Sequence, residues 1–206
     1  MSTTTRSLVV VTAGLGRPSS TRLLADRLAQ ATVLELADRG VTAEVTTVEL
    51  RDLAHDVVNA MLTGFPSGAL AGVIEQLTAA DGVIAVSPLF TTTYSGLFKS
   101  FVDVLDKDSL TGMPVLLGAT GGTARHSLAL EYGMRPLFTY LRADVATTTV
   151  FAATDDWAGA GDDTGPLPAR IARAGRELAE MVAARRNDGP PDPFADAPSF
   201  ADLLGS

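Results

Sequence analysis

The chain has no cysteine, which excludes disulfides, thiol nucleophiles and cysteine-ligated metal sites. Two histidines, His55 and His126, are too few for a His-rich zinc centre. Basic residues are scarce: 16 against 24 acidic ones give a net charge of −8, which argues against non-specific nucleic-acid binding. No apolar run reaches the roughly 18 residues of a membrane span, and Met1–Arg6 is polar, unlike a signal peptide. We therefore expect a soluble, cytoplasmic protein without a metal and without nucleic-acid or membrane partners.

Strand-like and helix-like segments alternate along the chain. Runs of apolar and β-branched residues predict five strands, at 7–12, 41–50, 82–87, 114–120 and 145–151. Pro88 is expected to end the third strand. Helical patterns lie between them, at 23–36 with Gly40 as the C-terminal cap, at 51–80 in two pieces, from 97 onward and at 168–186. The alternation predicts an α/β, flavodoxin-like three-layer sandwich with a five-stranded parallel sheet in the order 2-1-3-4-5.

The composition changes near the C-terminus. Residues 187–206 contain four aspartates and four prolines but no basic residue. We therefore expect one domain over residues 1–186, followed by an acidic, proline-rich tail over 187–206. The composition favours a disordered tail, although Phe194, Phe200, Leu203 and Leu204 also suit an arm that lies across a neighbouring subunit.

Three loops of unusual composition follow the first, third and fourth predicted strands. Ligands of open parallel sheets bind beyond the carboxyl ends of the strands, so these loops are expected to share one site. The first loop, residues 14–21, leads into a helix whose unpaired N–H groups attract anions, and Arg17 can hold phosphate oxygens in a bidentate way. Its spacing fits neither G-x-G-x-x-G nor a P-loop. Ser19 or Ser20 also fits an ordinary helix cap, but Arg17 beside these hydroxyls favours phosphate.

The other two loops leave a choice open when only their composition is considered. In the second, Phe90 and Tyr94 flank three threonines, which suits a flat ring with polar edges and equally suits a turn whose aromatics fill the core. In the third, the pair Gly121–Gly122 permits close approach of a ligand, although such a pair alone more often marks a tight turn.

Together these segments resemble the NAD(P)H-dependent FMN reductases of the flavodoxin-like fold. The likeness is greatest to the branch that supplies reduced flavin to two-component monooxygenases, such as those of alkanesulfonate metabolism. It spans residues 7–150 and is carried by residues 13–21, by Ser87–Pro88 through Lys99 to Asp103, and by 119–123 with His126, Leu130, Tyr132 and Pro136.

The resemblance implies FMN as cofactor, NADPH or NADH as hydride donor, and a homodimer or homotetramer. It assigns the FMN phosphate to Arg17, Ser19, Ser20 and Thr21. It assigns one border of the isoalloxazine and ribityl groups to Pro88, Leu89, Phe90, Thr91, Thr92, Thr93 and Tyr94. It assigns the other border to Thr120, Gly121, Gly122 and Thr123. Two residues depart from the family: Leu15 replaces a frequent serine, and Phe90 replaces a usual tyrosine.

The resemblance therefore implies an enzyme that transfers hydride from a reduced nicotinamide to FMN and supplies reduced flavin to a partner monooxygenase. No side chain is expected to be catalytic, because the flavin performs the hydride chemistry. One alternative is a quinone, azo or metal-ion reductase that retains its flavin. Another is a flavodoxin-like electron carrier or redox-sensing module. Flavodoxins commonly place an aromatic where this chain has glycines after the fourth strand, so an open ring face favours the reductase.

Overall fold

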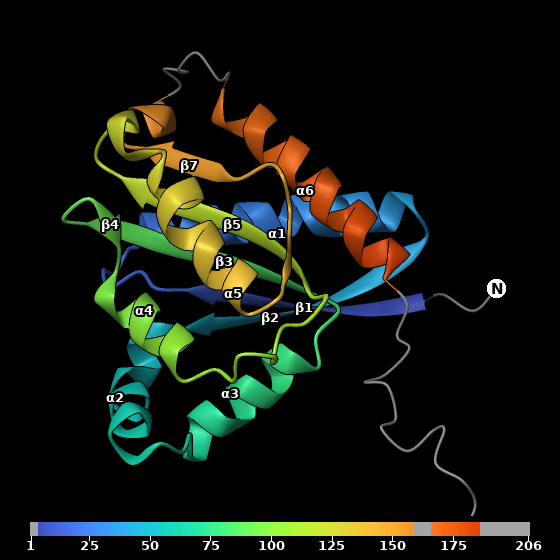
Figure 1. The fold of residues 1–206 in the computed structure, drawn as a ribbon. Helices are drawn as coiled ribbons and strands as arrows, with labels where there is room; N and C mark the ends of the chain where they lie inside the picture. The colour runs from blue at the N-terminus through green and yellow to red at the C-terminus, as the bar shows by residue number, and fades with distance from the viewer. Residues whose placement is uncertain (1–3, 159–165, 186–206) are drawn as a thin grey trace, which may run out of the picture.

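The sheet of the computed structural model is parallel and lies at the centre of the molecule (Figure 1). The structure describes residues 4–158 and 166–185. Its main strands are β1 (Thr4–Thr12), β2 (Val41–Glu49), β3 (Gly82–Phe90) and β5 (Pro114–Gly121), in the order β2-β1-β3-β5. Two short strands, β6 (Asp144–Val145) and β7 (Val150–Ala153), both pair with β5 and together fill the fifth position. The predicted fold class and strand order are thus confirmed.

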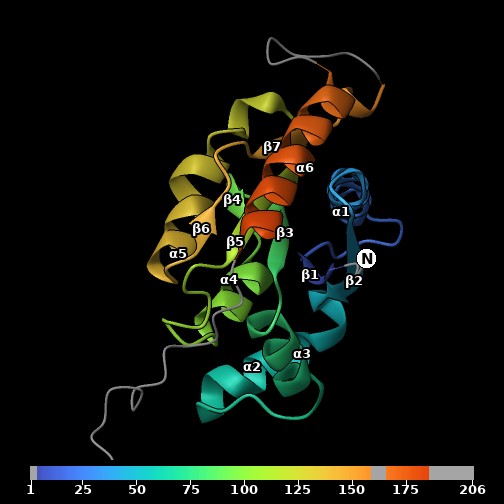
Figure 2. The same cartoon turned by 90° about the vertical axis from the view of Figure 1, so that its right-hand side faces the viewer.

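Helices cover both faces of this sheet (Figure 2). One face carries α1 (Ser20–Asp38) and α6 (Leu167–Ala184). The other carries α2 (Ala54–Thr63), α3 (Gly68–Thr78), α4 (Gly96–Asp103) and α5 (Arg135–Tyr140). Because side chains alternate along a strand, β1 sends Leu8 and Val10 into the first core and Val9 and Val11 into the second.

The prediction of one continuous fifth strand over 145–151 is wrong. Between β6 and β7 the Ala146 amide still donates to the Val115 carbonyl of β5, but the other bonded backbone groups take side chains of two helices as partners. Arg135 of α5 donates to the carbonyls of Ala146 and Thr147, each at 3.1 Å, and Glu177 of α6 accepts from the amides of Thr147 and Thr148. Residues 146–149 are therefore not part of a strand, although their residue types favour one, because tertiary partners satisfy their backbone polar groups.

The expectation that Pro88 ends the third strand is also wrong. β3 continues to Phe90, where a two-residue turn leads into a short antiparallel strand, β4 (Thr93–Tyr94), which the sequence reading missed. Pro88 is tolerated inside the strand because β1 has already ended opposite Val86. Beyond that pair, one edge of β3 has no β1 neighbour that would need a backbone N–H.

The remaining boundaries agree closely with the sequence. Helix α1 is followed by Gly40 at φ +72°, as expected of a C-terminal cap. The region 51–80 is helical in two main pieces, α2 and α3, and α6 replaces the predicted helix 168–186. Among the described residues, no single helix is long and apolar enough to cross a membrane. The segments Leu50–Thr63 and Gly68–Thr78 pass that test only as a pair, with an 89° bend between them. The predicted tail, 187–206, lies outside the described residues.

Candidate functional site: three loops at the carboxyl edge of the sheet

The three loops singled out from the sequence follow three adjacent strands, β1, β3 and β5. The register shows that these strands end at similar levels: Thr12 pairs with Val86, and Pro88 pairs with Thr120. Strands that run parallel and end together bring their following loops to one edge. The structure therefore brings together the three segments that hold the predicted site residues.

The loop after β1 is shaped by a glycine and a helix cap. Ser19 is the N-cap of α1, and its hydroxyl accepts a hydrogen bond of 3.1 Å from the backbone N–H of Arg22. A Cβ on Gly14 would lie 2.1 Å from the Ser19 hydroxyl oxygen, so only glycine allows this close packing. The N–H groups of Ser20 and Thr21 belong to the first turn, which has no intrahelical carbonyl to bond. These groups form the anion-attracting end of α1.

Arg17 extends from this loop toward solvent. Its side chain is 73% exposed and forms an ion pair of 3.2 Å with Asp52. Arg22, the next basic residue, is already committed: it donates to Asp26 and Glu49, and the hydrogen bond to Asp26 raises the pKa of its guanidinium. Arg17 is therefore the more available of these two guanidinium groups for a phosphate.

Two residues after β2, which the sequence reading missed, also contact the loop. Arg51 donates to the Gly16 carbonyl and pairs with Glu49, and Asp52 holds Arg17. Both follow the second predicted strand, whose carboxyl end lies beside that of the first in the order 2-1-3-4-5. That adjacency is the signal from which they could have been found. The Gly16 carbonyl is thus held by the guanidinium of Arg51.

Buried hydroxyls lie beneath the loop on the face of the sheet that α1 covers. Thr21 Oγ1 and Thr120 Oγ1 are 2.8 Å apart and hydrogen-bonded, so the first and third loops touch directly. Thr12, which the sequence reading missed, is 1% exposed, and its hydroxyl has no hydrogen-bond partner among the described residues. An orphaned buried donor at the end of a strand, beside a helix N-terminus, fits a site built for an acceptor-rich group such as phosphate.

The loop after β3 is a tight hairpin with strained backbone. Thr91 and Thr92, its two turn residues, have φ of 49° and 75°, a region that β-branched side chains rarely adopt. Phe90 is 46% exposed at the edge of this turn. Thr93 continues into β4, and its hydroxyl lies close to Gly133. Such strain commonly marks functional sites.

The base of the hairpin is anchored in the core. Pro88 is buried and Leu89 is partly buried. Tyr94 packs against Phe98 with ring centroids 6.2 Å apart, so part of this aromatic fills core space. The hydroxyl of Ser87, fully buried, accepts from the Ser95 amide at 3.0 Å, which joins the two ends of the hairpin.

The loop after β5 contains the two glycines, which differ in their surroundings. A Cβ on Gly121 would lie 2.9 Å from the Phe151 ring, so packing accounts for that glycine. Gly122 is exposed, with open space where its Cβ would be. Thr123 caps the following turn by accepting from the Arg125 amide at 3.4 Å. The loop thus offers a small residue and free space at the edge of the sheet.

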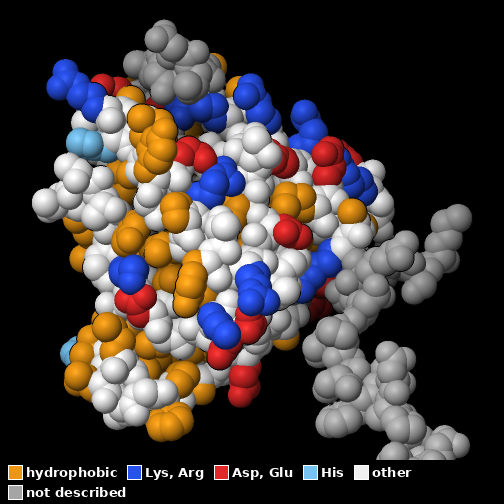
Figure 3. Space-filling model, in the orientation of Figure 1, with side chains coloured by type: hydrophobic (Ala, Val, Ile, Leu, Met, Phe, Trp, Pro, Cys, Tyr) orange, Lys and Arg blue, Asp and Glu red, His pale blue; other side chains and the backbone are white. Residues whose placement is uncertain are grey.

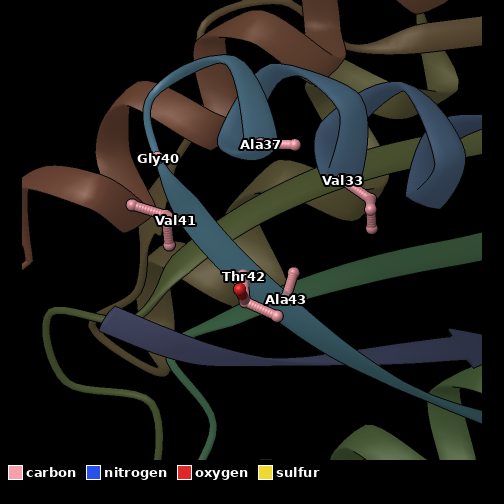
Figure 4. A pocket seen from close by; sticks show the side chains of 6 residues that line it. All are labelled: Val33, Ala37, Gly40, Val41, Thr42 and Ala43. Carbon is pink, nitrogen blue, oxygen red and sulfur yellow. The ribbon is translucent and has the colours of Figure 1, made fainter. Parts of the chain in front are cut away.

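Two hollows elsewhere on the molecule are not part of this edge. One, of about 280 Å³, is lined by Val33, Ala37, Gly40, Val41, Thr42 and Ala43 (Figure 4). It lies where α1 ends and β2 begins, at the opposite end of β2 from Glu49 and the first loop. Another, of about 410 Å³, lies between α4 and α5. Neither contains a residue of the three loops.

Comparison with known proteins identifies relatives of the whole described domain. Residues 7–158 match the model of the NADPH-dependent FMN reductase family. The chain is 33% identical over 178 residues to "FMN reductase (NADPH)" of Pseudomonas aeruginosa, which covers 86% of this chain and 93% of the relative. It is 32% identical over 174 residues to "NADH-dependent FMN reductase SfnF" of Pseudomonas fluorescens, with 84% and 90% covered. A solved oxidoreductase structure from Corynebacterium diphtheriae is 44% identical, with a TM-score of 0.84 over 88% of this chain and 99% of that one.

Proposed function

The chain belongs to the NADPH-dependent FMN reductase family, and from this premise we propose that the three loops bind FMN for reduction by NADPH or NADH. Its activity is that of an NAD(P)H:FMN oxidoreductase. The observation that carries the proposed site is the convergence of the loops after β1, β3 and β5 at one edge. The first loop contributes a helix N-terminus and an available arginine, and the last residue of β1 contributes an orphaned hydroxyl.

The protein's own groups bind FMN and orient it toward the nicotinamide. The amides of Ser20 and Thr21, with Arg17 and the hydroxyl of Ser20, hold the phosphate at the start of α1. The hairpin, Pro88 to Tyr94, borders one side of the ring system, and Thr120 to Thr123 borders the other. FMN supplies the hydride-accepting ring, so no protein acid or base is required. Because Gly122 has no side chain, it leaves room for the nicotinamide. Holding the nicotinamide ring against the flavin ring accounts for the rate of hydride transfer.

The direct test compares flavins that differ only in their phosphate. Oxidation of NADPH and of NADH is measured with FMN, FAD and riboflavin in turn, and a strong preference for FMN over riboflavin is expected. Arg17→Ala should weaken FMN binding by about 1.5–3 kcal/mol, the usual contribution of a hydrogen bond to a charged group. Arg176→Ala, an exposed arginine on α6, serves as the control. Absence of turnover with every flavin would overturn the proposed function.

A partner monooxygenase is proposed to consume the reduced flavin. A hairpin tip that is exposed at Phe90 and a third loop exposed at Gly122 support a cofactor that can leave. The test is release of reduced FMN under anaerobic conditions, followed by its capture by a flavin-dependent monooxygenase. If reduced flavin instead remained bound while a quinone was reduced quickly, the partner proposal would be replaced by a quinone reductase.

A homodimer or homotetramer is proposed for the assembly. Val58, Met61, Leu62 and Phe65 form an apolar stripe at helical spacing on α2 and the turn that follows it, and they are 50–81% exposed. Figure 3 shows hydrophobic side chains gathered over this part of the molecule. Burial of the stripe against a second copy would remove it from water. Light scattering should give a multiple of 21.4 kDa, and Leu62→Glu with Phe65→Glu should lower the measured mass.

Two further assignments remain proposals. The reductase domain is proposed to span residues 1–186, and the location is proposed to be the cytoplasm. Cell fractionation tests the location, and a chain stopped at Asn187 that retains activity and assembly would support the domain boundary.

A further inference from the structure

The hydrogen bond between Thr21 and Thr120 joins two loops to which the family resemblance assigns different roles. Thr21 lies in the first turn of α1, in the phosphate loop, whereas Thr120 is the next-to-last residue of β5, beside the glycines of the ring loop. Both side chains are buried, at 2% and 5% exposure, and their hydroxyl oxygens are 2.8 Å apart. Either oxygen can be the donor in this contact. Which of the two hydroxyls donates therefore depends on whether either one has a further hydrogen-bond partner.

The buried Thr21–Thr120 pair has one hydroxyl hydrogen that its single contact does not use. Each hydroxyl carries one hydrogen and two lone pairs, so the Thr21–Thr120 contact uses only one of the two hydrogens. No other hydrogen bond of either hydroxyl is present among the described residues. The hydroxyl of Thr12, on the same face of the sheet, also lacks a partner there. Two hydroxyl hydrogens are thus left without an acceptor in a part of the molecule closed to bulk water.

A phosphate at the start of α1 would supply an acceptor for the unused hydrogen, and it would also decide which of the two threonines donates to the other. Phosphate oxygens only accept, so a hydroxyl that contacts them must donate. If Thr21 donates to the phosphate, its lone pairs are free to accept from Thr120, and both hydrogens of the pair are used. Hydrogen bonds in such a chain polarise one another, which strengthens the contact with the anion.

We propose that Thr120 is a positioning residue for the FMN phosphate, acting through Thr21 in the chain Thr120→Thr21→phosphate. The inference rests on the proposed function and differs from the family resemblance, which places Thr120 at the ring. It also means that an occupied phosphate loop holds the end of β5, and with it the ring loop, in one arrangement.

The test is the affinity of Thr120→Val for two flavins, measured by fluorescence titration of FMN and of riboflavin. Valine keeps the shape and removes the hydroxyl. FMN binding should weaken about 3- to 10-fold, the effect of one hydrogen bond, while riboflavin binding stays within about twofold. Thr120→Ser, which restores the hydroxyl, should recover the affinity for FMN. Thr32→Val, which removes a buried hydroxyl of α1 that donates to the Leu28 carbonyl, should change neither affinity.

The outcomes separate this inference from the proposed function. Equal weakening of both flavins by Thr120→Val would place Thr120 at the ring and overturn the chain, as would an unchanged affinity for FMN. Failure of the unaltered protein to prefer FMN over riboflavin would instead overturn the phosphate site itself. Thr120→Val leaves the buried Thr21 hydroxyl without its partner, so the melting temperature without flavin should fall by a few degrees. A single cooperative unfolding transition then shows that the variant is folded.

Discussion

The ion pair between Arg17 and Asp52 is expected to oppose flavin binding. In the structure the Arg17 guanidinium lies 3.2 Å from the Asp52 carboxylate, with the two side chains 73% and 60% exposed. For Arg17 to hold a phosphate it must give up this partner, so the free energy of the pair is subtracted from that of binding. Pairs exposed to this degree contribute about 0.2–1 kcal/mol. Asp52→Asn should therefore tighten FMN binding by up to roughly fivefold.

The assay is a titration with FMN and riboflavin at low and high salt. The gain should be confined to FMN and should shrink as salt rises, because exposed charges are screened. Asp52 also lies 3.8 Å from Arg51, so a general change in local charge must be separated from the release of Arg17. Adding Arg17→Ala does this, since Asp52→Asn should then have no further effect. Unchanged or weaker FMN binding by Asp52→Asn would refute the reasoning.

Three other predictions concern stability in the absence of flavin. Thr92→Gly should raise the free energy of unfolding by about 1 kcal/mol in urea titration, because φ of 75° is strained for threonine, whereas Thr93→Gly in β4 should lower it. Thr12→Val should raise the melting temperature, with a gain of about 1 kcal/mol, by removing a buried hydroxyl without a partner; a fall would indicate an unseen acceptor. The hydrogen bond from Arg135 holds the pKa of Glu131 below its ordinary value, so this pair stabilises the fold above that value and its contribution is lost as pH falls through the lowered pKa. Glu131→Gln should thus be destabilising at neutral pH, and its difference from the unaltered protein should vanish in acid; a difference independent of pH would contradict this.

Much of the fold follows from local pattern. Apolar runs such as the one that became β1 indicate strands buried on both faces, and a parallel sheet with right-handed crossovers has few possible orders. Gly40, at positive φ, ends α1 where a glycine was expected. The same reasoning places the loops after β1, β3 and β5 at one edge, because that outcome depends only on strand order and direction.

The errors arose where distant groups outweighed local preference. The strand predicted over 145–151 is interrupted because Arg135 and Glu177, from two different helices, take its backbone groups. Pro88 stays inside β3 because β1 is shorter at that end. In both cases the partner lies far along the chain, and no local pattern records its position.

The sequence by itself therefore determined the order of the strands, the edge at which the three loops gather and the residue types found there. Only the tertiary structure decided which of these residues touch: that Arg17 lies against Asp52, that Thr21 bonds to Thr120, and that Thr12 is buried without a partner. The physical reason is the distance along the chain over which each kind of interaction acts. Strand and helix preferences act over a few neighbouring residues, whereas hydrogen bonds and ion pairs depend on ångström distances between segments that only the packed chain defines.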